Sequence, residues 1–138
     1  MDVNINYLAV LVAAAASFIL GWIWYGPVFG KIWMELAGIT PEKPSTAKMI
    51  GISSLGFVGS LLMSYVLAHA LIFASAYTKM EGAGAGLMVG FWNWLGFIAP
   101  VTAGAVLWEG KSWKLWVLNN AYWVVSLLGM GIILSVWR

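Results

Sequence analysis

The sequence predicts an all-α fold, an integral membrane protein built as a four-helix transmembrane bundle. Of the 138 residues, 62% are hydrophobic and only 9% are charged, whereas about 25% of the residues of an ordinary soluble domain are charged. So few charged side chains cannot cover the surface of a protein in water. The charges also fall in clusters, separated by stretches longer than the roughly 20 residues that a bilayer-spanning helix needs. We therefore expect one transmembrane domain over residues 1–138.

Four charge-free runs provide the four spans. They cover residues 3–30, 49–78, 82–108 and 115–137. None alternates between apolar and polar residues as a barrel strand does, and an isolated strand leaves its backbone unpaired in lipid, so each run is expected to be helical. We place the helices at residues 5–28, 49–77, 84–108 and 114–137.

The connection between the first two spans has structure of its own. Residues 31–37 form a short amphipathic segment that stops at Gly38, which predicts a helix lying along the membrane interface. Pro41 and Pro44 then turn the chain, and Ser45 or Thr46 can cap the second transmembrane helix.

The loops differ in their content of Lys and Arg, which sets orientation in a membrane. The first and third loops carry five basic residues, against two on the other side: Lys31, Lys43, Lys48, Lys111 and Lys114 against Lys79 and Arg138. We therefore expect a multi-pass protein of the cell inner membrane. Both termini would lie outside, with loops 29–48 and 109–114 in the cytoplasm.

A faint internal repeat follows the first and third spans. Gly30-Lys31-Ile32-Trp33 and Gly110-Lys111-Ser112-Trp113 share three of four residue types in register. Either each half of the chain is a repeated helical hairpin, or both segments anchor independently at the interface.

Small residues recur along one face of several spans, where they allow close backbone approach in lipid. The helix-packing candidates are Gly56, Ser60, Ser64, Gly82, Gly86 and Gly90. They can pack the bundle internally or form a subunit interface. Because the chain has more such stripes than one small bundle needs, we expect a homo-oligomer in the lipid bilayer.

Polar side chains in the apolar runs are the candidates for solute binding, because such residues are costly in lipid and often functional. They are His69, Trp92, Asn93, Trp94, Asn119 and Asn120. Folding the second span onto the third places His69 opposite Asn93, which predicts a polar cluster in the outer half of the membrane. A neutral histidine that only stabilises the hairpin is the alternative to a binding or proton-relay role.

Asn119 and Asn120 form a second candidate group. They lie at about the depth of three aromatic residues at the end of the first span, namely Trp22, Trp24 and Tyr25. We expect amide hydrogen bonds to the indole or phenol groups there. These bonds either hold the helices together or contribute to a binding site.

The composition argues against catalysis and against bound cofactors. There is no cysteine and only one histidine, so no metal cluster is expected, and the net charge of +2 gives no nucleic-acid footprint. The glutamates fall at boundaries or in loops, and no nucleophile, zinc or phosphate-loop motif is present. We expect neither an enzyme nor a cofactor.

Several segments resemble a family of small bacterial four-helix membrane proteins catalogued as domain of unknown function seventeen sixty-one. They are Met1–Asn4, Gly21–Lys31, Trp94–Pro100, Leu107–Leu115 and Asn119–Trp123. The resemblance implies a four-helix inner-membrane protein and carries over no activity. It draws attention to the exit of the first span at Trp24-Tyr25-Gly26-Pro27 and to the turn Glu109-Gly110-Lys111. That family often has Arg and Pro in place of Lys111 and Ser112, so a role requiring a bidentate guanidinium is not implied here.

The leading functional hypothesis is a homo-oligomeric binder or passage for a small neutral or weakly polar solute, lined by residues of the second, third and fourth spans. The alternative is a structural or accessory membrane protein that modulates a larger complex and has no pore or catalytic site.

Overall fold

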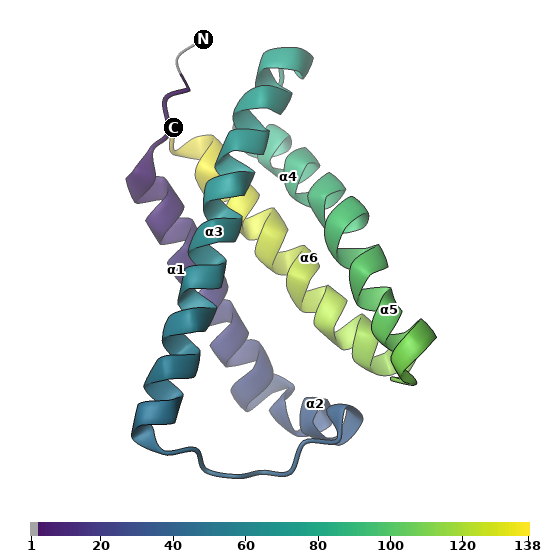
Figure 1. Cartoon of the computed structure of the whole chain (residues 1–138). Coiled ribbons are helices and arrows are strands. Elements are labelled where there is room, and N and C mark those ends of the chain that lie inside the picture. The colour runs from purple at the N-terminus through teal and green to yellow at the C-terminus, as the bar shows by residue number, and fades with distance from the viewer. Residues whose placement is uncertain (1–2) are drawn as a thin grey trace.

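The computed structural model describes residues 3–138, and all regular structure in this range is helical. The Met1-Asp2 pair, part of the sequence resemblance, lies outside the described residues. Four helical spans are long and apolar enough to cross a membrane: Tyr7–Val28, Thr46–Thr78, Gly82–Glu109 and Trp113–Val136. Figure 1 shows them as a bundle with both chain ends and the turn between the second and third spans at one end. The all-α, multi-pass membrane fold predicted from the charge-free runs is therefore confirmed.

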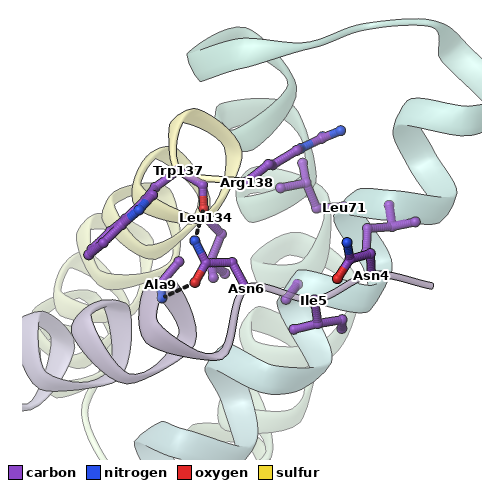
Figure 2. A pocket seen from close by; sticks show the side chains of 10 residues that line it. Asn4, Ile5, Asn6, Ala9, Leu71, Leu134, Trp137 and Arg138 are labelled. Atoms are coloured by element: carbon purple, nitrogen blue, oxygen red, sulfur yellow. Dashed lines mark hydrogen bonds between the residues drawn. The ribbon is translucent and has the colours of Figure 1, made fainter. Parts of the chain in front are cut away.

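The first span begins on an asparagine that also joins the two ends of the chain. Helix α1 (Tyr7–Ile23) is capped by Asn6, whose Oδ1 accepts hydrogen bonds from the backbone N–H groups of Leu8 and Ala9, both at 3.1 Å. The amide nitrogen of Asn6 donates to the carbonyl oxygen of Trp137 at 3.1 Å, as Figure 2 shows. The side chain of Asn6 thus binds free backbone N–H groups at the start of α1 and fixes the C-terminal segment beside it.

The first span ends in a π-helical turn and a sharp bend. Segment η1 (Trp24–Val28) contains Pro27, which lacks the N–H of a regular turn, and α2 (Gly30–Ala37) follows at once. A Cβ on Gly30 would lie 2.8 Å from the carbonyl oxygen of Tyr25, so only glycine allows this close turn. The short helix predicted over residues 31–37 is present and begins at Gly30.

The second span is packed along only part of its length. Helix α3 (Thr46–Thr78) is capped by Ser45, whose Oγ accepts from the N–H of Lys48, and it contains the predicted range 49–77. Its buried residues all lie in the second half, at Ser64, Leu67, Ala68, Leu71 and Ser75. The first half therefore presents most of its surface to the surroundings.

The third span is interrupted in the same way as the first. It consists of α4 (Gly82–Asn93), η2 (Trp94–Ile98) and α5 (Ala99–Glu109). Both π-helical segments start at the second tryptophan of a W-x-W-x-G sequence, Trp22–Gly26 in the first span and Trp92–Gly96 in the third. This structural correspondence adds to the faint repeat seen after the same spans and favours a duplicated hairpin.

Helix α6 (Trp113–Val136) is the centre of the bundle. It packs against α1, α3, α4 and α5, and it carries more buried residues than any other described helix. Backbones of α4 and α6 approach most closely where Gly86 faces Gly131, since a Cβ on either would overlap the carbonyl group of the other. A Cβ on Gly90 would likewise lie 2.6 Å from the carbonyl oxygen of Leu127. Such contacts are typical of helix association in lipid.

The remaining packing candidates play different parts. Gly82 opens α4 with a φ of 66°, a backbone conformation that favours glycine. Ser64 is fully buried and donates to the carbonyl oxygen of Val10 at 2.9 Å, which joins α3 to α1. Ser60 returns its hydrogen bond to the carbonyl of Gly56 on its own helix.

Candidate functional site

A seam of polar side chains on α6 connects this helix to the first span. The Oδ1 of Asn119 accepts a hydrogen bond from the hydroxyl of Tyr25 at 2.7 Å. Further along, the hydroxyl of Tyr122 donates to the carbonyl oxygen of Ser17 at 3.0 Å, and the Oγ atoms of Ser17 and Ser126 are 2.5 Å apart. These bonds fix the rotation of α6 about its axis relative to α1.

Asn120 connects the same helix to the third span and is the most fully bonded side chain of the seam. It is 2% exposed. Its Oδ1 accepts from the indole N–H of Trp94 at 2.9 Å, and its amide nitrogen donates to the Oγ1 of Thr102 and the carbonyl of Trp116, both at 3.0 Å. The indole of Trp116 in turn donates to the carbonyl oxygen of Ala99 at 3.2 Å. These bonds hold the π-helical segment η2 against α6. Short π-helical segments inside α-helices are frequent at functional sites.

An apolar groove lies beside η2, between α3, the third span and α6. Its volume is about 410 Å³, and its lining residues are Leu62, Met63, Val66, Leu67, Asn93, Phe97, Ile98 and Leu127. Asn93 supplies the amide in this lining. Its nitrogen donates to the carbonyl oxygen of Val89 at 2.8 Å, and this is the one hydrogen bond of the Asn93 side chain within residues 3–138, so its Oδ1 is left without a donor there. We call this cavity the Asn93 groove.

A second cavity of about 160 Å³ lies between α5 and α6, at the end of the bundle that holds the third loop. Its lining residues are Thr102, Ala105, Val106, Lys111, Leu115, Trp116, Asn119 and Asn120. We call it the loop-end pocket. The hydroxyl of Thr102 donates to the carbonyl oxygen of Ile98 at 2.7 Å, so one hydrogen bond joins the linings of the two cavities.

A third cavity, beside the chain ends, has room for little more than one water molecule. Its volume is about 30 Å³, above the roughly 10–15 Å³ that a single water requires. Figure 2 shows it among Asn4, Asn6, Leu71, Leu134 and the C-terminal residues. We assign this cavity a structural role, because the side chain of Asn6 already caps α1 and binds the C-terminal segment.

The predicted contact between His69 and Asn93 does not form. The His69 ring packs edge-on against Tyr65 with centroids 4.4 Å apart, and its Nδ1 lies 2.9 Å from the carbonyl oxygen of that residue. Tyr65 also stacks on Tyr7 of α1. Asn93 meanwhile returns its hydrogen bond to its own helix. The expectation of a joint polar cluster was wrong because depth in the membrane says nothing about which way a side chain points around the helix axis.

The tryptophan and asparagine side chains also have partners that differ in part from those predicted. Trp92 is 61% exposed and faces away from the bundle, whereas Trp94 reaches Asn120. The pairing of Asn119 with Tyr25 agrees with the expected depth. Asn120 was expected at the first span and instead joins the third, since it follows Asn119 by about 100° around the helix.

Sequence reasoning missed the hydroxyls that complete the network. Thr102 was not singled out, although it lies inside an otherwise apolar run and two residues after Pro100. Ser17 was not singled out either, yet its backbone carbonyl accepts a hydrogen bond from Tyr122 and its hydroxyl shares one with Ser126. Polar residues within the charge-free runs were the available signal.

The four spans and the polar seam define a small multi-pass helical membrane protein. Residues 8–135 match the family model described as "Protein of unknown function (DUF1761)", so the chain belongs to that family. The resemblance noted from the sequence motifs is thereby confirmed. Neither the curated proteins nor the solved structures yield a significant match.

Proposed function

We propose that this membrane protein binds a small neutral or weakly polar solute in the Asn93 groove. The observation that carries the proposal is one amide with a free acceptor oxygen in an otherwise apolar cavity of about 410 Å³. Ligand sites are commonly apolar with a few placed polar groups. A hydroxyl or N–H of the solute would donate to Asn93 while its hydrocarbon contacts Phe97 and Leu67.

The character of the lining also supports a neutral solute over an ion. None of the residues lining the groove is charged. An ion placed there would lose its hydration without gaining an opposite charge, which is costly at membrane depth. An alcohol or amide needs only one hydrogen-bond partner, and Asn93 supplies it.

In this proposal the other sequence candidates have separate roles. Trp94 and Asn120 hold η2 in place as a wall of the groove through their mutual hydrogen bond. Asn119 faces the loop-end pocket instead. His69 contributes no side chain to the groove, so it serves as a control position.

We further propose that the functional unit is a homo-oligomer and that passage of the solute requires it. Gly51 and Gly59 on the sparsely packed half of α3 have no atom within 4 Å of where a Cβ would lie. They leave a surface on which a second copy can approach closely. An accessory role in a larger membrane complex is the alternative, favoured by the equally bare surface of α5, where Val101 is 73% exposed.

The binding proposal is tested with a diazirine derivative of octanol as the probe. The purified protein is reconstituted in lipid and photolabelled, and the labelled residues are mapped by mass spectrometry. We expect label at Met63, Leu67 and Phe97, less label in Asn93→Ala, and unchanged label in His69→Ala. Labelling that is the same in all three proteins would overturn the proposal.

Passage is tested separately by the swelling of proteoliposomes in a glycerol gradient. Faster swelling than in empty liposomes, reduced in Asn93→Leu, would support passage through or beside the groove. Swelling equal to that of empty liposomes would reject passage of glycerol. The binding proposal is decided separately, by the photolabelling result.

A further inference from the structure

We propose that the loop-end pocket is a binding site for a phosphate group, supplied by an anionic phospholipid. The site is distinct from the Asn93 groove, so the inference does not depend on the proposed function. Three features carry it: the lysine in the lining, an amide with free N–H groups, and the position of the pocket beside the third loop, where the membrane interface is expected.

The lysine is held in position by the geometry of the turn before it. Helix α5 ends at Gly110 with a φ of 72°, and the backbone N–H of Lys111 donates to the carbonyl oxygen of Ala105 at 3.0 Å. The N–H of Gly110 donates to the same carbonyl, so two successive backbone N–H groups close the end of the helix on Ala105. This closure fixes the backbone of Lys111, which is one of the residues that line the pocket.

The groups left free inside the pocket are hydrogen-bond donors. The Oδ1 atoms of Asn119 and Asn120 accept from Tyr25 and Trp94, and the hydroxyl of Thr102 both donates and accepts. The amide nitrogen of Asn119, by contrast, donates to no atom of residues 3–138. A ligand in this pocket is within reach of the long side chain of Lys111 and of an amide donor, and an ammonium group and an amide N–H together suit an oxyanion.

The surroundings place the pocket where phospholipid headgroups lie. Trp108 is 85% exposed, and the rings of Trp113 and Trp116 pack edge to face with centroids 5.7 Å apart. Tryptophans and lysines at a helix end form the interfacial belt of membrane proteins. Leu115 and Val106 give the pocket an apolar wall, against which the glycerol and upper acyl chain of a lipid can pack.

The inference is tested by native mass spectrometry of the full chain in detergent with added phosphatidylglycerol. We expect bound lipid in the parent and about fivefold weaker binding in Lys111→Gln. Asn119→Ala should also weaken binding, whereas Lys111→Arg should retain it. Lys114→Gln is the matched control, because Lys114 is in the same interface and does not line the pocket.

The remaining outcomes are decisive as well. Equal losses in Lys111→Gln and Lys114→Gln would show general attraction to basic residues and would overturn the site. Displacement of the lipid by millimolar glycerol 3-phosphate or inorganic phosphate would overturn the lipid as its source. Circular dichroism of each variant, with the helix content of the parent retained, excludes unfolding as the cause of a loss.

Discussion

The indole N–H of Trp94 donates to the Oδ1 of the buried Asn120 across 2.9 Å. The corresponding tryptophan of the first W-x-W-x-G sequence, Trp24, buries its indole nitrogen without a partner among residues 3–138. Two equivalent π-helical segments thus differ in one hydrogen bond. In the third span, which lines the Asn93 groove and the loop-end pocket, this tryptophan is hydrogen-bonded to α6. In the first π-helical segment the hydrogen bond to α6 comes from Tyr25 instead.

This difference predicts unequal effects of the same substitution. Trp94→Phe leaves the Oδ1 of Asn120 unpaired in a buried site and should lower the free energy of unfolding by about 1–3 kcal/mol. Trp24→Phe removes a donor that has no partner, so its hydrogen-bond contribution to the change should be near zero. Reversible unfolding in mixed micelles measures both. A larger loss for Trp24→Phe would contradict the assignment.

The contact between α4 and α6 predicts a position-dependent response to one methyl group. Gly131→Ala places a Cβ against the carbonyl group of Gly86 and should destabilise by about 1–3 kcal/mol. Gly129→Ala, two residues away on the same helix, meets open space and should be neutral or stabilising. Thermal unfolding in detergent compares the two. Equal melting temperatures would show that the helices do not approach as closely as described.

The exposed half of α3 predicts a change in assembly without a change in fold. If the proposed homo-oligomer forms through this face, Gly59→Leu should convert it to a smaller species, because the leucine prevents close approach of a second copy at a surface that is open in one chain. Gly104→Leu on α5 is the control. Single-molecule photobleaching in bilayers counts the subunits, and an unchanged count in Gly59→Leu would exclude this face as the interface.

The orientation inferred from basic residues predicts which loops are reachable from outside the cell. The natural sequence has no cysteine, so single substitutions can be labelled cleanly. Glu81→Cys should react with a membrane-impermeant maleimide in intact cells, and Ser45→Cys should react only after the membrane is opened. The reverse pattern would invert the assigned topology.

The spans were predictable from the sequence because a charge in hydrocarbon is costly, and this cost confines charged residues to the ends of helices. The range 49–77 was predicted, for example, and α3 runs over Thr46–Thr78. Side-chain direction was not predictable in the same way. His69 and Asn93 share a depth in the hairpin, yet one packs on Tyr65 and the other lines the groove.

The π-helical turns explain much of what the sequence pattern could not supply. Each adds a residue to a helical turn and so changes the direction in which later side chains point. Trp94 opens such a segment and reaches Asn120 of α6, and Thr102, which follows the segment, contacts the same asparagine. The W-x-W-x-G sequence occurs at both π-helical segments, but the sequence alone does not predict that the helix widens there.

The most direct test of the central claim is competition during photolabelling with the octanol diazirine. If the Asn93 groove binds a neutral, weakly polar solute, excess octanol should remove most of the label from Met63, Leu67 and Phe97. It should leave the background label at the exposed Leu55 of the same helix unchanged. Label spread evenly along α3 and unaffected by octanol would contradict the account.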